Sequence, residues 1–300
     1  MFRTMIRSVA LVALLALVTP ASAQHAKFVL FGDPAPDAAK AAPEHRFVHP
    51  VTSPYWHEDS FVTSDLRGWY AYHNFPTSST IGGGDANVYA VQARLALTSQ
   101  LQLVAYKDGF LETESGLAPV NEDGWQDIAA GLKWNFLQDF NNQLHAAVGA
   151  GYQFALGDHV LADDEELRLW ASINKGFDRL HLGATVNFFL ANDKGNTLAG
   201  NSDHVSWHVH ADYFVCNWFS PVVEFNGYHV VDEGTVVVPF QGVDVANLGG
   251  TTKNDVITFG VGAEFRPINN LGIRAAYEMP LTEGDQLFGY RWTFSVVFSF

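Results

Sequence analysis

The chain has 300 residues, of which 32 are acidic and 17 basic, so its net charge is −15. This excess of negative charge argues against nucleic acid as a partner, because the phosphate backbone repels it. Cys216 is the single cysteine, which excludes an internal disulfide, and the sequence contains no Cys/His spacing of the kind that holds a metal.

The first 23 residues have the pattern of a secretory signal peptide. Arg3 and Arg7 precede an apolar run over residues 9–18, and the small residues Ala-Ser-Ala follow at 21–23. We therefore expect the mature chain to begin at Gln24. The apolar run is too short to span a membrane as a helix, and the rest of the sequence has no run of about 18 apolar residues. A role in a membrane would have to be built from strands.

Residues 24–64 differ in composition from the remainder of the mature chain. They are rich in Ala and Pro in the middle and show no sustained alternation, which predicts an arm or linker before a strand-rich domain at residues 65–300. The second half of this arm contains Pro-Tyr-Trp-His at 54–57, which is too aromatic for a disordered tether.

From residue 65 onward, runs of about ten residues alternate apolar side chains with small or polar ones. Ile128, Leu132 and Trp134, for example, fall on one side of a strand whose other side carries Lys133 and Asn135. Side chains alternate across a strand, so each run has one apolar flank and one polar flank. The sequence predicts strands at residues 66–75, 87–98, 101–108, 128–136, 144–154, 167–174, 180–190, 205–213, 221–230, 257–265, 271–278 and 290–300.

The last strand has the clearest pattern. One flank carries only apolar side chains, whereas the other, with Arg291, Thr293 and Ser295, is mostly polar. This segment resembles the C-terminal assembly signal of Gram-negative outer-membrane β-barrel proteins, which end in Phe or Trp with apolar residues at every second position. The resemblance is to a class, and it implies recognition by the barrel-assembly machinery. The residues that carry the signal are Tyr290, Trp292, Phe294, Phe298 and Phe300.

The predicted connections alternate between short turns and longer loops. Outer-membrane barrels join their strands by short periplasmic turns and longer outer loops. The pattern therefore predicts an all-β, antiparallel up-and-down transmembrane barrel of about twelve strands with both termini on the periplasmic side. A soluble barrel or sandwich would alternate too, but it would have to bury its apolar flank in a closed core. We expect the aromatic part of the arm to pack at or into the periplasmic mouth and partly close the lumen.

If the apolar flank of each strand meets lipid, the other flank lines a lumen. Register across the connections predicts that Glu264 lies near Arg274, Glu278 near Arg291, and His210 near Glu224. Such pairs neutralise charge inside a barrel, and they can also form a constriction that filters solutes. The predicted pore-lining residues are Arg94, Lys133, Arg168, His208, His210, Asp212, Glu224, Glu264, Arg274, Glu278 and Arg291.

Two chemical alternatives involve the strand at residues 205–213. His208 and His210 share a face with Asp212, a set that includes zinc ligands but lies along one strand, so a proton-sensitive cluster is the favoured interpretation. Ser206 and His208 lie two residues apart, as in barrel phospholipases and lipid A deacylases. Their order is reversed, however, and both side chains fall on the lumen side, away from acyl chains.

The sequence as a whole predicts an outer-membrane channel of a Gram-negative bacterium for passive passage of small solutes. We expect no catalytic residues, no metal and no cofactor, and we expect lipid, lipopolysaccharide and a small-molecule solute as partners. The alternative is a structural or adhesive barrel with a plugged lumen. A lipid-modifying barrel enzyme is a third and weaker possibility.

Overall fold

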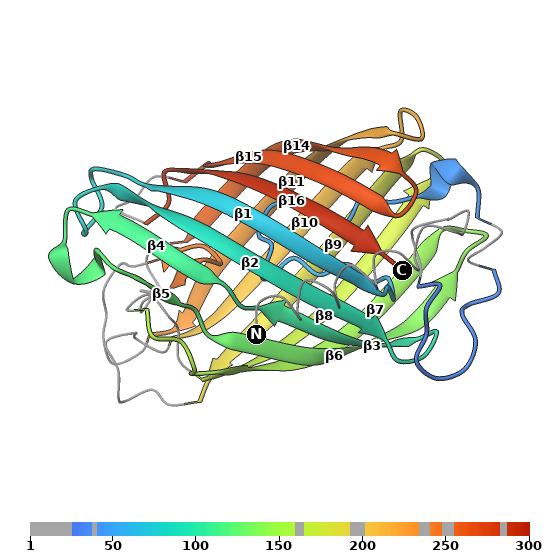
Figure 1. The fold of residues 1–300 in the computed structure, drawn as a ribbon, viewed down its shortest axis with the longest axis horizontal. Helices are drawn as coiled ribbons and strands as arrows, with labels where there is room; N and C mark the ends of the chain where they lie inside the picture. Colours follow the sequence, from blue (N-terminus) through green and yellow to red (C-terminus); the bar gives the residue numbers. More distant parts are fainter. Residues whose placement is uncertain are drawn as a thin grey trace, which may run out of the picture.

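The computed structural model describes residues 26–37, 41–159, 165–192, 202–233, 241–247, 255–282 and 287–300. The predicted signal peptide, residues 1–23, and the predicted mature N-terminus at Gln24 lie outside the described residues. In the part that is described, no helix is long and apolar enough to cross a membrane. The described residues form antiparallel strands, loops and two short 3-10 turns, η3 (Pro43–His45) and η4 (Ala118–Val120) (Figure 1).

The strands form one closed barrel because β1 pairs with both β2 and β16. Strands β3 and β4 pair with different halves of β2, so together they take the place of one strand. Strands β5 and β6, which pair with β4 and β3, likewise take the place of one strand. The closed wall therefore has twelve strands. The predicted fold class is therefore confirmed. The strands are β1 (Asp65–Phe75), β2 (Gly84–Ala96), β3 (Leu101–Lys107), β4 (Phe110–Ser115), β5 (Asp123–Trp125), β6 (Ile128–Asp139), β7 (Leu144–Phe154), β8 (Glu166–Phe177), β9 (Leu180–Ala191), β10 (Asp203–Tyr213), β11 (Phe219–Asp232), β14 (Val256–Ile268), β15 (Leu271–Pro280) and β16 (Tyr290–Ser299).

The wall has its apolar side chains outside and its polar side chains inside. On β6, Leu132 and Trp134 are 47% and 53% exposed, whereas Lys133 and Asn135 between and beyond them are 0% exposed. An apolar outer belt of this kind suits hydrocarbon as solvent, and closure of the sheet pairs the backbone groups that hydrocarbon cannot satisfy.

Strand β16 lies between β15 and β1, where it completes the wall. Trp292, Phe294 and Val296 are exposed on the outer surface, and Arg291 and Thr293 are buried on the inner side. The two flanks of the last strand thus point in the directions that the sequence predicts.

Short and long connections lie at opposite ends of the barrel. The short turns are residues 97–100, 140–143, 178–179, 214–218 and 269–270. The C-terminus lies at this short-turn end (Figure 1). The longer connections lie at the other end, and one of them carries a small hairpin of β12 (Gln241–Gly242) and β13 (Ala246–Asn247).

The structure differs from the sequence prediction at residues 109–124, which belong to one of the longer loops expected between the strands predicted at 101–108 and 128–136. Strands β4 and β5 extend the wall there, and β4 pairs with the first half of β2. Gly109, between β3 and β4, has a φ of 134°, an angle that residues with a side chain rarely adopt. The break at Gly109 and the two glutamates of β4 hide the strand pattern, because charged side chains on a strand resemble those of a solvated loop.

Candidate functional site: the barrel lumen

The structure places all the predicted pore-lining residues on the inner side of the wall. Each of them is at most 2% exposed, so they are shielded from solvent. These residues are Arg94, Lys133, Arg168, His208, His210, Asp212, Glu224, Glu264, Arg274, Glu278 and Arg291. The second half of the N-terminal arm covers most of these side chains.

We call residues 47–64 the lumen segment. The chain enters at the short-turn end, where the Arg46 guanidinium donates to the Asn217 carbonyl in the turn between β10 and β11 at 2.8 Å. It extends to Tyr55, whose backbone N–H donates to Asp244 in the hairpin of a long connection at 3.1 Å. It then returns to the short-turn end, where the Phe300 N–H donates to the Ser64 carbonyl at 2.9 Å. The lumen segment therefore extends through the barrel, well beyond the mouth where we expected it to pack.

An ionic cluster holds the returning half of the lumen segment. Arg94 on β2 contacts Glu58, and the Lys133 ammonium on β6 lies 3.4 Å from a carboxylate oxygen of Asp59 and 3.5 Å from one of Glu58. The guanidinium of Arg67 on β1 lies 3.9 Å from a carboxylate oxygen of Asp59. The lumen segment thus supplies two carboxylates to a part of the wall that carries three cations.

The surroundings of these two carboxylates shift their pKa values downward. Burial by itself would raise the pKa of Glu58, but the charges of Arg94 and Lys133 outweigh it and lower the pKa. Burial acts in the same way on Asp59, where His49 and Lys133 hold the pKa well below its usual range. Both carboxylates are therefore charged wherever the lumen segment is docked near neutral pH.

A second set of contacts holds the entering half through its backbone. Glu224 on β11 accepts hydrogen bonds from the backbone N–H groups of Val51 at 3.0 Å and Thr52 at 2.6 Å. Asp212 on β10 accepts from the Val48 N–H at 3.0 Å. His210 lies between the two carboxylates, 2.6 Å from Glu224 and 3.1 Å from Asp212. The predicted pair of His210 and Glu224 is confirmed, and it is part of the seat for the segment.

The tip of the lumen segment is held by one arginine and by aromatic packing. The Arg168 guanidinium on β8 donates to the carbonyl of Tyr55 at 3.0 Å and to that of Trp56 at 2.6 Å. The Trp56 ring packs on Phe189 and His204, with ring centroids 4.5 and 4.9 Å away. This is the most apolar part of a lumen whose other contacts are largely polar.

Two further predicted pairs connect neighbouring strands. Arg274 donates to Glu264 at 2.8 Å, and Arg291 donates to Glu278 at 2.6 Å, which confirms the expected register. Arg291 also contacts Asp244, so the same cation fixes the hairpin that receives the tip of the segment. The part played by Asp244 could not be predicted, because it lies in a connection without periodicity.

Ser206, His208 and Asn226 form a chain of hydrogen bonds. Ser206 Oγ lies 2.9 Å from His208 Nε2, and His208 Nδ1 lies 2.8 Å from Asn226 Oδ1. The His57 ring stacks on the His208 ring, with the ring centroids 5.0 Å apart. Ser206, His208 and Asn226 are fully buried. The lumen segment therefore covers the only serine and histidine that we considered for hydrolysis. Among the described residues, no three His, Cys, Asp or Glu side chains are arranged to hold a metal ion.

Comparison with known proteins identifies the fold of the chain. No protein-family model matches the chain, and no curated protein sequence matches it. Among solved structures, an outer membrane channel from Pseudomonas putida F1 is similar, with a TM-score of 0.56 and 12% identity over 85% of this chain and 100% of that one. The fold is that of an outer-membrane β-barrel. The KdgM porin also matches, with a TM-score of 0.49 and 9% identity over 79% of this chain and 99% of that one.

Proposed function

We propose that the chain is an outer-membrane channel for small solutes, and that the lumen segment closes it at rest. The observation that supports this most is the position of residues 47–64, which fill a polar, charged lumen inside a wall that is apolar outside. A solute could pass only when the segment moves.

The way in which the segment is attached favours such movement. It enters and leaves at the same end of the barrel, so it can withdraw without being threaded through the wall. None of the strand pairings of the barrel uses a residue from 47–64. Its anchors are largely hydrogen bonds and ion pairs with wall side chains. A hydrogen bond to a charged group contributes a net of only about 1.5–3 kcal/mol, because water replaces it when the segment leaves.

A deletion tests the proposal. The rings of Phe47 and Phe61 lie 4.8 Å apart at the base of the segment, so residues 48–60 can be replaced by Gly-Ser-Gly without disturbing either end. We expect wild-type liposomes to swell measurably in small sugars and amino acids, and the shortened variant to swell faster and to conduct more current in planar bilayers. Gel mobility before and after heating shows whether each barrel is folded.

A structural barrel with a permanently plugged lumen is the second candidate, and it is favoured by the burial of every residue of the lumen segment except Pro50 and Pro54, which are partly exposed. The two candidates differ in the wild-type protein. If folded wild-type barrels leave liposomes as impermeable as lipid alone while the shortened variant conducts, the channel proposal is wrong and the plugged barrel is supported.

The same proposal includes the surroundings of the barrel. We place the apolar belt in the lipid of a Gram-negative outer membrane, with lipopolysaccharide around the longer connections. We also propose that Tyr290, Trp292, Phe294, Phe298 and Phe300 are read by the barrel-assembly machinery. Removal of Phe300 should then lower the amount of folded barrel in the outer membrane, and unchanged amounts would reject this part of the proposal.

A further inference from the structure

One carboxylate of the lumen segment is bound by donors from two strands of the wall. Nε of Arg94 on β2 donates to Oε2 of Glu58 at 3.4 Å, and its Nη2 donates to Oε1. Nζ of Lys133 on β6 lies 3.5 Å from Oε2 of the same carboxylate. Each of these three side chains is at most 2% exposed. Two cations from different strands therefore converge on one carboxylate group.

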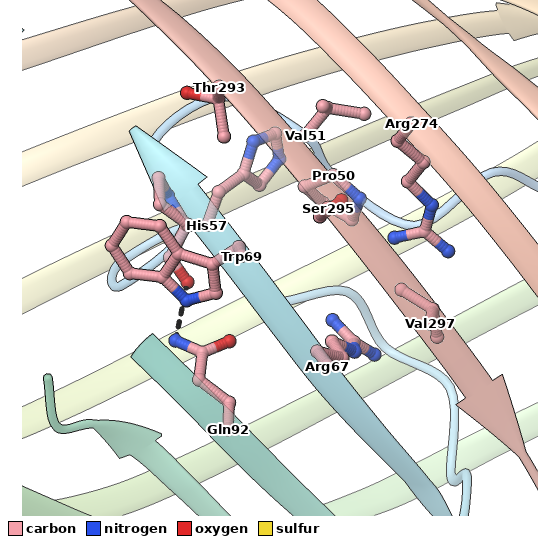
Figure 2. Close-up of a pocket in the computed structure, with 11 residues that line it drawn as sticks. Pro50, Val51, His57, Arg67, Trp69, Gln92, Arg274, Thr293, Ser295 and Val297 are labelled. Atoms are coloured by element: carbon pink, nitrogen blue, oxygen red, sulfur yellow. Dashed lines mark hydrogen bonds between the residues drawn. The ribbon is translucent and has the colours of Figure 1, made fainter. Parts of the chain in front are cut away.

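The wall itself holds the Arg94 guanidinium in this position. Its Nη1 donates to Oε1 of Gln92, two residues earlier on β2, at 3.3 Å. The Gln92 amide in turn donates to the Tyr106 carbonyl on β3. Gln92 lies opposite Arg67 in the pairing of β1 and β2, and both line a small pocket beside His57 of the lumen segment (Figure 2). The support of Arg94 thus does not depend on the lumen segment.

Arg67, the third cation near these carboxylates, has a partner within the wall. Its Nε and Nη2 donate to the two carboxylate oxygens of Asp65 at 2.7 and 3.4 Å. Asp65 lies opposite Arg94 in the pairing of β1 and β2, but Arg67 binds both of its oxygens. Among the described residues, the carboxylates that form ion pairs with Arg94 and Lys133 both belong to the lumen segment.

Withdrawal of the lumen segment would therefore take the carboxylate partners away from Arg94 and Lys133. A solute that carries a carboxylate can replace Glu58 there, because the guanidinium fork matches two carboxylate oxygens and the ammonium adds a point charge. We propose that Arg94 and Lys133 form a binding site for the carboxylate group of a solute, and that Glu58 occupies this site while the segment is docked. This deepens the proposed function by naming the chemical class of the solute, and it rests on that function for the path of the solute.

Chemical rescue tests the site without transport. Glu58→Ala removes the carboxylate and weakens docking, so trypsin should cleave faster after Arg46, which is buried in the docked arm. Acetate carries the two carbons and the carboxylate that this substitution removes. We expect saturating acetate to slow the cleavage of Glu58→Ala at least about threefold, because it restores charge-assisted hydrogen bonds and binds the docked state. Acetamide, its neutral analogue, should leave the rate unchanged at the same ionic strength.

Double variants show whether the acetate binds at the proposed site. Glu58→Ala/Arg94→Gln should lose the protection by acetate. Glu58→Ala/Arg266→Gln is the matched control, because Arg266 is a buried cation that pairs within the wall, and acetate should protect it as it protects Glu58→Ala. If the Arg94 double variant does not fold, Glu58→Ala/Lys133→Met should lose the protection instead. Equal protection by acetate and acetamide, or equal protection with and without Arg94, would overturn the proposal.

Current measurements connect the site to the path of the solute. In planar bilayers with a gradient of sodium acetate, the reversal potential should shift toward cation selectivity from the wild type to Arg94→Gln, because a positive charge is lost from the lumen. The same reversal potential in both proteins would overturn this role. Rescue by acetate in a barrel that does not conduct would refute the channel and leave the site standing. A conducting channel without rescue would refute the site and leave the channel standing.

Discussion

The wall of the barrel and the lumen segment are held by different kinds of contact. In the wall, neighbouring strands are joined by backbone hydrogen bonds, and β1 closes the ring by pairing with both β2 and β16. The lumen segment is held by side chains of the wall, such as Glu224 and Arg168, that bind its backbone. This difference means that the lumen segment can leave its position without breaking the backbone hydrogen bonds of the wall.

The largest effect is expected at the ionic cluster of the lumen segment. Glu58→Ala leaves Arg94 buried without its main partner, which destabilises docking by about 3–5 kcal/mol. Arg46, which is buried in the docked arm, should then be cleaved by trypsin much faster than in the wild type. Glu44→Gln is the control, because Glu44 lies in the arm outside the cluster. Equal cleavage rates for Glu58→Ala and the wild type would show that the cluster does not hold the segment.

A smaller effect is expected on the outer face of the wall. Leu132→Arg puts a charge on the side of β6 that we assign to lipid, and should lower the free energy of unfolding in vesicles by about 2–4 kcal/mol. Leu132→Met keeps the side chain apolar and should cost less than about 1.5 kcal/mol. Reversible urea unfolding monitored by tryptophan fluorescence measures both. A harmless arginine at this position would mean that the outer belt does not meet hydrocarbon.

The smallest effect is expected from acid. The pKa values of Glu58 and Asp59 are lower in the docked segment than in a free one. Their contribution to docking is therefore complete above the ordinary carboxylate pKa of about 4 and is lost as the pH falls below it. Urea midpoints measured from pH 6 to pH 3 should fall in the wild type and change less in the Glu58→Gln/Asp59→Asn double variant. Parallel curves would refute this assignment.

Apart from β4 and β5, the wall could be predicted from the sequence because its strands alternate with a period of two. The alternation on β6 and β16 gives their faces, and the short turn before β15 gives the register that brings Glu264 to Arg274. The path of the lumen segment could not be predicted. It has no periodicity, and its partners, such as Arg168 and Asp244, lie more than a hundred residues away in the sequence. The aromatic residues at 54–57 indicated that the segment docks but not how deep.

The claim that the lumen segment must move for solutes to pass can be tested with a reversible lock. A Cβ atom built at Gly260 on β14 would lie 3.5 Å from Cβ of Thr52, which is within the range of a disulfide. The variant Thr52→Cys/Gly260→Cys, in a Cys216→Ser background, should show little current in planar bilayers when oxidised and recover a conductance close to that of the wild type after reduction. The same conductance in the oxidised and the reduced state would contradict the account.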